Sequence, residues 1–321
     1  MKAIVVSENS WAEKSELVEV SVPEPAEGQV RVAVEVAGVN YLDIYQRNGA
    51  LTAPFNGGVE GVGRVSAVGE GVNPAVVGHR VGWLGGQGSY AESVVLAETK
   101  TVTIPEDISN DDAVALLMQG VTAHYLATSA FAVGKDSTVL VHSGAGGVGR
   151  LLVQIARHLG ATVIATASTA DKRRIAIDAG ADHAVDYQGF DAAVAELTNG
   201  VGVDVIYDGV GKDTVERDLK ALAVRGTLCV IGAASGPPPA VEFATLAAKS
   251  LSVIRPSIAH FTARPGELAW RAEEVFRWAR EGVVSTTIAG RYSLEDTAKA
   301  QQDLTSRSLA GKLVIDISPQ V

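Results

Sequence analysis

The chain has 321 residues, of which 47% are hydrophobic and 20% are charged, and its formal net charge at pH 7 is −10. This acidity disfavours nucleic acid and anionic membrane surfaces as partners, because both carry negative charge themselves. The single cysteine, Cys229, excludes an intramolecular disulfide and a four-thiolate structural zinc site. We expect it to be an inert buried thiol.

The N-terminal part predicts mostly β-structure. It opens on a short apolar run without the features of a secretory leader, and no apolar run approaches the roughly 18 residues that span a bilayer. We therefore expect a cytoplasmic protein. Residues 29–36 alternate as a strand does, and glycine-rich turns follow between residues 57 and 88, which is typical of a small barrel-like domain. A helix then begins near residue 110, with Ser109 or Asn110 as its N-cap.

From Thr138 onward, apolar strands alternate with helices. Right-handed strand–helix–strand units of this kind build a doubly wound parallel sheet, and six strands complete a dinucleotide-binding domain. The expected strands cover residues 138–144, 161–168, 183–187, 203–211, 226–233 and 251–257. Two helical stretches at residues 265–282 and 293–306 and a last strand at 311–317 follow, and we expect this end to fold back on the N-terminal domain.

The strongest local motif is a glycine-rich turn between the first of these strands and a helix. It matches G-x-G-x-x-G and consists of Gly144, Ala145, Gly146, Gly147, Val148 and Gly149. Glycines let the backbone approach a pyrophosphate, and the N-terminus of the helix supplies N–H donors and a positive dipole end. The sequence therefore predicts a dinucleotide site.

NADPH is favoured over NADH by the end of the next strand. An NAD site places an acid there to bind the ribose 2′-hydroxyl. Here Ser168 and Thr169 occupy that region and Lys172, Arg173 and Arg174 follow, so a 2′-phosphate would meet hydroxyls and cations. The alternative is that the basic residues form a solvated helix face.

Two further turns follow strands at the carboxyl edge of the predicted sheet, where ligands bind in doubly wound folds. They contain Val210 in one turn, and Ile231 and Gly232 in the other. Both turns are candidates for cofactor contact, although each could be a plain turn.

The histidines give no sign of a metal site. None of His79, His124, His142, His158, His183 and His260 pairs with another histidine, a cysteine or an acid at ligand spacing on one element. We expect each of them to be a packed or surface residue.

Several spaced segments together resemble the quinone oxidoreductase and zeta-crystallin branch of the medium-chain dehydrogenase/reductase superfamily. They are VAGVNYLDIYQRNG, GVEGVGRVSAVGEGV, QGVTAHYL, VLVHSGAGGVG, VIYDGVG and RPS, and they span nearly the whole chain. The resemblance implies an α/β protein with a GroES-like, mostly-β catalytic domain at residues 1–117 and 258–321. It also implies a Rossmann NADPH-binding domain with a six-stranded sheet at residues 118–257.

The resemblance also implies roles for single residues. It places Thr122 near the cofactor, Lys172 at the 2′-phosphate, Tyr187 beside the adenine and Arg307 near the phosphate end. Asn40, Tyr45 and Arg255 would lie close to the nicotinamide or substrate. Asn40 and Val59 stand where zinc-containing members carry a cysteine and a histidine, which implies zinc-independent chemistry. Gln119 stands where relatives often carry a lysine, and its role is open.

These residues imply reduction of a quinone by hydride transfer from NADPH. Water can supply the proton that a reduced quinone takes up, whereas an enone needs a proton delivered, which Tyr45 would donate unless it is a wall residue. Asn40 would donate a hydrogen bond to a carbonyl unless it is a turn or cap residue. Reduction of an activated C=C bond in an alkenal or enone is an alternative. A low-turnover NADPH-binding sensor or RNA-binding protein is a further alternative, and the net charge counts against RNA binding. The apolar edge strand near residues 250–255 predicts a homodimer.

Overall fold

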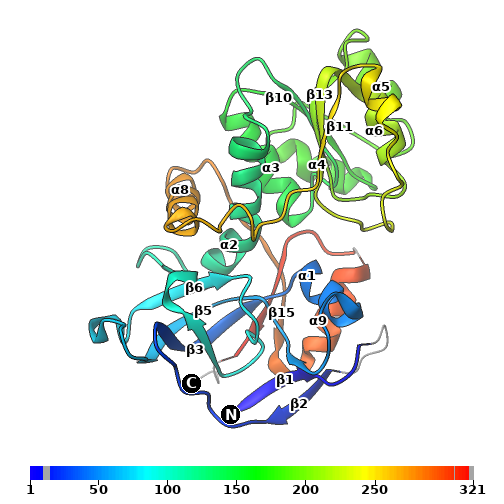
Figure 1. The fold of residues 1–321 in the computed structure, drawn as a ribbon. Helices are drawn as coiled ribbons and strands as arrows, with labels where there is room; N and C mark the ends of the chain where they lie inside the picture. Colours follow the sequence, from blue (N-terminus) through cyan, green and yellow to red (C-terminus); the bar gives the residue numbers. More distant parts are fainter. Residues whose placement is uncertain (10–14, 307, 318–321) are drawn as a thin grey trace. The chain divides into compact units, whose positions relative to one another are not determined.

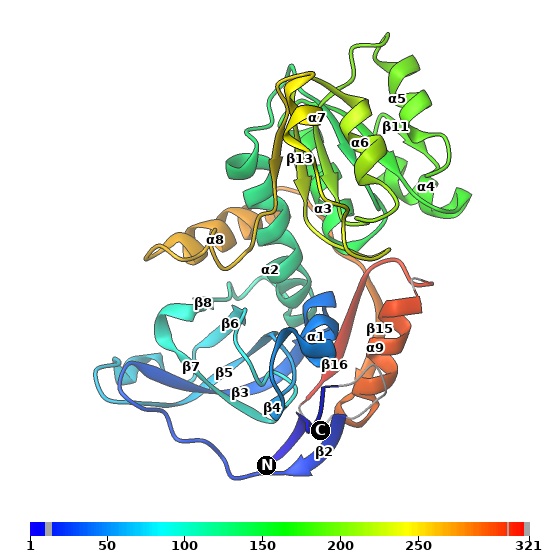
Figure 2. The same cartoon turned by 45° about the vertical axis from the view of Figure 1, so that its right-hand side comes forward.

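A computed structural model of the protein describes residues 1–9, 15–306 and 308–317 (Figures 1 and 2). The chain forms two compact units. The first comprises Met1–Met118, Ala263–Arg277 and Thr286–Val321, and the second comprises Gln119–Thr262 and Trp278–Ser285. Residues 258–262 and 278–285 thus belong to the second unit, whereas the ranges expected from the sequence placed them in the GroES-like domain. Two contacts explain the second segment: Ser285 N–H donates to Gln154 Oε1 over 2.6 Å, and the Trp278 ring lies 5.3 Å from that of His124.

The secondary structure follows the predicted order. The described strands are β1 (Lys2–Val6), β2 (Ser15–Glu19), β3 (Gln29–Gly38), β4 (Phe55–Asn56), β5 (Glu60–Val68), β6 (Arg80–Leu84), β7 (Ser93–Ala97), β8 (Thr101–Thr103), β9 (Thr138–Val141), β10 (Thr162–Thr166), β11 (His183–Val185), β12 (Val203–Asp208), β13 (Leu222–Val230), β14 (Ser252–Ile254), β15 (Ile288–Ser293) and β16 (Lys312–Asp316). The described α-helices are α1 (Tyr41–Tyr45), α2 (Asn110–Tyr125), α3 (Gly147–His158), α4 (Ala170–Asp178), α5 (Phe190–Leu197), α6 (Val215–Ala221), α7 (Phe243–Ala247), α8 (Glu267–Arg280) and α9 (Thr297–Ser306). Among these helices, none combines the length and apolarity needed to cross a membrane.

The first unit is organised around β3. Its apolar residues at alternate positions, from Val30 to Val36, are buried, as the period of a strand requires. In the described residues β3 pairs antiparallel with β5, β7 and β16, and β15 pairs in parallel with β16. The C-terminal segment therefore does fold onto the N-terminal sheet. Strand β15 was not predicted, because its sequence IAGRYS has no apolar alternation.

The second unit holds the predicted parallel sheet. Its described strands run in the order β11-β10-β9-β12-β13-β14, which is the doubly wound order of a Rossmann fold. Helices α3 and α4 pack on β9, β10 and β11, whereas α6 packs on β12 and β13 and lies beside α5 (Figure 2). Because β9 pairs in parallel with β10 and β12, the carboxyl ends of these strands share one edge of the sheet. The glycine turn lies at that edge.

The N-cap of α2 is Ser109. Its Oγ accepts a hydrogen bond from the N–H of Asp112 over 3.0 Å, and its carbonyl accepts one from the N–H of Ala113. Of the two candidates from the sequence, Asn110 is instead the first residue of the helix.

Candidate cofactor and active site

The glycine turn connects β9 to α3 in the second unit and needs its glycines for steric reasons. A Cβ on Gly149 would lie 2.2 Å from the carbonyl oxygen of Ser143, and one on Gly144 would lie 2.7 Å from Ala165 Cβ. Any larger residue at either position would force the turn away from α3 or β10. The turn is therefore as tight as the motif requires.

Helix α3 begins at Gly147, with Gly146 as its N-cap in an extended conformation. Gly147, Val148 and Gly149 form its first turn, and the N–H groups of a first turn have no acceptor within the helix. The first turn carries no acidic side chain that would compete for them. The predicted residues Gly144 to Gly149 thus form an N-terminus suited to a pyrophosphate. The side chain of Gln119 contacts this turn, because its Cγ lies 3.1 Å from a Cβ built on Gly147.

Ser143 and Tyr187 join two strand ends beside the glycine turn. Ser143 has a φ of +55°, which is uncommon for a residue with a Cβ. Its N–H donates to the Tyr187 hydroxyl over 3.0 Å, and the two hydroxyl groups lie 2.8 Å apart. The half-buried Tyr187, predicted beside the adenine, is therefore fixed to the turn itself.

The region predicted for the 2′-phosphate lies at the start of α4. Ser168 is exposed, and Thr169 is the N-cap of the helix, its Oγ1 accepting from the Lys172 N–H over 3.2 Å. Arg173 donates from its guanidinium to the carbonyl of Ala167 over 3.2 Å. Ser168 and the half-buried Lys172 thus lie at one helix start, whereas Arg173 is engaged with the backbone.

The two other strand-end turns are joined to each other. The carboxylate of Asp208 accepts from the N–H of Val210 over 2.6 Å, and its carbonyl accepts from the N–H groups of Ile231 and Gly232. A Cβ on Gly232 would lie 2.7 Å from the carbonyl oxygen of Gly209. Val210, Ile231 and Gly232 therefore form one packed group at the carboxyl edge of the sheet.

The remaining cofactor candidates are more scattered. Thr122 is half-buried in the part of α2 that belongs to the second unit, and Arg255 is exposed directly after β14. Arg307 lies outside the described residues.

In the first unit, Asn40 lies in a buried polar network. Its Nδ2 donates to the Gly38 carbonyl over 3.2 Å and to Glu60 Oε2 over 3.0 Å, and its Oδ1 accepts from Lys312 Nζ over 2.9 Å. Lys312 also donates to Glu60 Oε2 over 2.5 Å, and Glu60 Oε1 accepts from the Met118 N–H over 2.6 Å. Because an ammonium group only donates, the orientation of the Asn40 amide is determined.

Asp43 continues this network. Its Oδ2 accepts from the Asn40 N–H and from the Tyr90 hydroxyl, each over 2.7 Å. Burial raises the pKa of Asp43 to about 7, although the bonds from Tyr90 and Asn40 and the charge of Lys312 oppose this rise. Burial, followed by the charge of Asp43, raises the pKa of Tyr90 well above its ordinary value.

Tyr45 ends α1, and its side chain is exposed. Its ring centroid lies 6.4 Å from that of Tyr41, whose hydroxyl donates to the Leu304 carbonyl over 3.2 Å. No described residue forms a hydrogen bond with the Tyr45 hydroxyl. Its position suits both a proton donor and an amphipathic wall residue.

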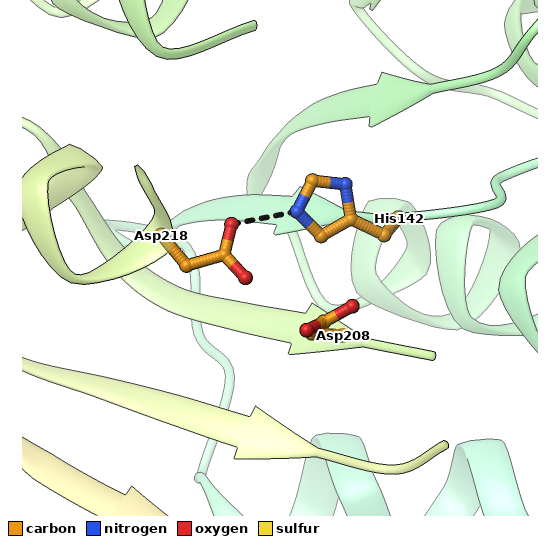
Figure 3. A group of neighbouring side chains, drawn as sticks. All are labelled: His142, Asp208 and Asp218. Carbon is orange, nitrogen blue, oxygen red and sulfur yellow. Dashed lines mark hydrogen bonds and ion pairs between the residues drawn. The ribbon is translucent and has the colours of Figure 1, made fainter. Parts of the chain in front are cut away.

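Two polar clusters were not predicted from the sequence. One is the Glu60–Lys312–Asp43 group, whose only signal is a charged residue in each of the mostly apolar segments GVEGVG, GKLVIDI and VNYLDIY. The other brings together the buried residues His142, Asp208 and Asp218, of which His142 directly follows β9, Asp208 ends β12 and Asp218 lies on α6 (Figure 3). His142 is packed, as expected, but its acidic neighbours lie on other elements, where spacing along one element gives no signal.

Comparison with known proteins agrees with this architecture. Residues 26–106 match the alcohol dehydrogenase GroES-like domain, and residues 147–272 match the family described as zinc-binding dehydrogenase. A quinone oxidoreductase of Pseudomonas aeruginosa is 38% identical over 91% of this chain and 92% of its own length. The chain belongs to the quinone oxidoreductases of the medium-chain dehydrogenase/reductase superfamily. The resemblance stated from the sequence is thereby confirmed.

Solved structures of quinone oxidoreductases and their relatives show the same fold. The Escherichia coli quinone oxidoreductase in complex with NADPH has a TM-score of 0.95 and 32% identity, covering 99% of this chain and 100% of that one. A mycobacterial protein in complex with NADPH has a TM-score of 0.94 and 42% identity over the same shares. A 2-haloacrylate reductase of Burkholderia is 36% identical over 92% of this chain and 93% of its own length.

Proposed function

We propose that this quinone oxidoreductase family member reduces quinones with NADPH by hydride transfer, without zinc. The observation that carries the proposal is the glycine turn, whose missing Cβ atoms and acid-free helix start suit a dinucleotide pyrophosphate. Relatives named quinone oxidoreductase, one of them solved with NADPH, support it. Bound NADPH supplies a hydride to the quinone, and a proton from water completes the hydroquinone.

The chain's own contribution to cofactor binding is positional. The backbone of Gly144 to Gly149 would hold the pyrophosphate, and Ser168 and Lys172 the 2′-phosphate. The other proposed contacts are Thr122, Tyr187, Val210, Ile231, Gly232, Arg255 and Arg307. These contacts would orient the reduced nicotinamide ring of NADPH, and orientation is most of what a hydride transfer requires.

For proton donation to a reduced alkenal or enone, we propose Tyr45 as the main candidate. Both hydrogens of the Asn40 amide already bond to Gly38 and Glu60, so Asn40 could stabilise a substrate oxyanion only by giving up one of these bonds. The hydroxyl of Tyr45 is exposed and has no such competing bond among the described residues. We therefore propose that Asn40 shapes the start of α1 and assists the substrate to a lesser extent.

The proposal of zinc independence is supported by the donor set at the positions where zinc-containing members carry ligands. Val59 is buried and offers no donor atom, and Asn40 Oδ1 is 2.9 Å from the ammonium of Lys312. The ammonium of Lys312 at that distance would repel a zinc ion bound to Asn40. These residues do not fit a catalytic zinc ion.

The proposal is tested by comparing the oxidation of NADPH and NADH with 1,4-benzoquinone, before and after treatment with a chelator. We expect turnover with NADPH, weaker turnover with NADH and no loss after chelation. A folded protein that binds NADPH but turns over no quinone would contradict the proposed activity. Loss of turnover on chelation, restored by zinc, would contradict zinc independence.

Reduction of an activated C=C bond is the second candidate, and the similarity to a 2-haloacrylate reductase favours it. An alkenal and a haloacrylate assayed in parallel with the quinone distinguish the two, with the saturated product identified by mass spectrometry. Tight NADPH binding without turnover on any acceptor would instead favour the low-turnover sensor.

We also propose a cytoplasmic homodimer that pairs through β14. This strand is an edge of the six-stranded sheet in the described residues, and Ser252 and Val253 are exposed on it. An exposed apolar edge strand favours pairing with a second copy. A monomeric mass by light scattering at micromolar concentration would contradict the dimer. The buried free thiol of Cys229 is in keeping with a reducing compartment.

A further inference from the structure

His142 is a buried histidine that directly follows β9 and precedes Ser143 and the glycine turn. Its Nε2 lies 2.7 Å from Asp218 Oδ1 on α6 (Figure 3), and its Nδ1 lies 2.8 Å from Thr166 Oγ1 at the end of β10. A neutral imidazole satisfies both bonds if Nε2–H donates to the carboxylate and the threonine hydroxyl donates to Nδ1. Asp218 and Thr166 thus determine the tautomer and the plane of the ring.

The same ring contacts the side chain that holds the glycine turn. The centroids of His142 and Tyr187 are 5.8 Å apart with an interplanar angle of 24°, and the hydroxyl of Tyr187 is bonded to Ser143. Arg217 fixes the other end of this segment by donating to the Tyr187 carbonyl over 2.6 Å. A displacement of the imidazole would therefore reach Tyr187, and through it the left-handed turn at Ser143.

Burying the carboxyl group of Asp218 costs more free energy than a purely structural role requires. Its side chain is fully buried, and its Oδ2 has no hydrogen-bond partner among the described residues. Burial raises its pKa to about 6; His142 opposes this rise, and the neighbouring carboxyl of Asp208 adds to it. An apolar side chain would fill the same place without an unsatisfied oxygen. What Asp218 provides, and an apolar residue would not, is the bond that orients His142.

A metal ion is a poorer explanation of the cluster. One ligand atom from each of His142, Asp208 and Asp218 lies within 4.8 Å of the others. However, both nitrogens of His142 are hydrogen-bonded, and the Asp208 oxygens accept from the N–H groups of Val210 and Gly211 and from the hydroxyl of Thr214. A metal would displace several of these bonds, so the cluster is better explained as a hydrogen-bonded support.

We propose that the His142–Asp218 pair is a positioning device for NADPH: it holds the ring against which Tyr187 stacks, and so holds the Ser143 turn from which the glycine loop starts. This inference rests on the NADPH site proposed above. His142 and Asp218 act through Tyr187 and are positioning residues.

The test compares Asp218→Ala with Asp218→Asn. Removing the carboxylate should weaken NADPH binding about tenfold, the size expected for one lost charge-assisted hydrogen bond, and raise the KM for NADPH equally. The kcat at saturating NADPH should change by less than about twofold. The Oδ1 of an asparagine can accept from Nε2–H as the carboxylate oxygen does, so the hydroxyl of Thr166 can still donate to Nδ1. The Asn variant should therefore bind NADPH within about twofold of the wild type, with the imidazole tautomer unchanged in its 15N NMR shifts.

Leu219→Ala is the matched control, because Leu219 is buried on the same helix and belongs to the apolar core. It should lower the Tm without changing the KM for NADPH. The inference is overturned if Asp218→Ala binds NADPH as tightly as the wild type, or if Leu219→Ala at equal Tm loss weakens binding as much. Weakened NADPH binding in a folded Asp218→Asn variant that keeps the tautomer would overturn it even if the alanine variant does not fold. A wild-type protein that fails to bind NADPH would instead contradict the proposed function, and this inference would fail with it.

Discussion

The ammonium of Lys312 on β16 donates a 2.5 Å hydrogen bond to Glu60 Oε2 on β5, and both side chains are buried. Removal of one member of a buried pair leaves the other charge uncompensated, which typically costs roughly 3–5 kcal/mol.

We therefore expect Lys312→Met to lower the midpoint of urea unfolding strongly, with a cost of that order. The double variant Lys312→Met/Glu60→Gln should recover part of it, because the unpaired charge is then gone. Lys299→Met, which breaks an exposed pair with Asp303, serves as the control and should have a much smaller effect. A cost for Lys312→Met no larger than that of Lys299→Met would contradict the buried pairing.

The raised pKa of Asp43 predicts a pH-dependent stability. The pKa rises from 3.8 to about 7 on folding, chiefly through burial. The folded protein therefore keeps a proton that the unfolded chain loses above about pH 4. The contribution of this retained proton to the free energy of unfolding amounts to roughly 4 kcal/mol. It is fully present below pH 4 and is lost as the pH rises through 7.

Asp43→Asn should remove this dependence. The oxygen of the amide can still accept from Asn40 and Tyr90, since one oxygen of Asp43 accepts both bonds. The unfolding free energy of the variant, measured between pH 4 and 8, should fall less with pH than that of the wild type. Parallel curves for the two proteins would contradict the assigned pKa.

The steric role of Gly149 predicts that alanine is not tolerated there. Its Cβ would lie 2.2 Å from the Ser143 carbonyl oxygen, so the turn must open and the helix N-terminus must shift. We expect Gly149→Ala to weaken NADPH binding by more than about tenfold, because the pyrophosphate depends on this geometry. Gly134→Ala, at a site with no heavy atom within 4 Å, should bind NADPH normally. Equal titration curves for the two variants would exclude this role for Gly149.

The proposed 2′-phosphate site predicts a change of cofactor preference. Lys172→Ala should raise the KM for NADPH by roughly 10-fold or more, the value of a charge-assisted hydrogen bond, and leave the KM for NADH nearly unchanged. Arg174→Ala removes an exposed cation from the same helix and should alter neither constant greatly. If Lys172→Ala raises both constants alike, Lys172 has no role in selecting the phosphate.

The role of Tyr45 can be separated by substrate. An alkenal needs a proton delivered to the product, whereas a reduced quinone takes one readily from water. Tyr45→Phe should therefore lower kcat with an alkenal by roughly 10- to 100-fold and change quinone turnover by less than about twofold. Tyr41→Phe, which loses a bond to Leu304, is the control and should affect both substrates alike. Full alkenal activity in Tyr45→Phe would identify Tyr45 as a wall residue.

The amino-acid sequence by itself determined the doubly wound sheet, its six strands and the glycine turn from Gly144 to Gly149. These features are local: strand and helix periods, and a turn that only small residues permit, are visible in consecutive residues. The sequence also placed the start of α2 near residue 110, but it left Ser109 and Asn110 as alternative N-caps, and the structure decided for Ser109.

Only the tertiary structure decided the polar clusters. Glu60 and Lys312 are 252 positions apart, and His142 and Asp218 are 76 apart, so neither pairing leaves a periodic trace in the sequence. The structure also showed that both hydrogens of the Asn40 amide are engaged, which its position in a motif could not reveal. Buried polar groups depend on partners that folding brings together, and their chemistry is a property of the packed molecule.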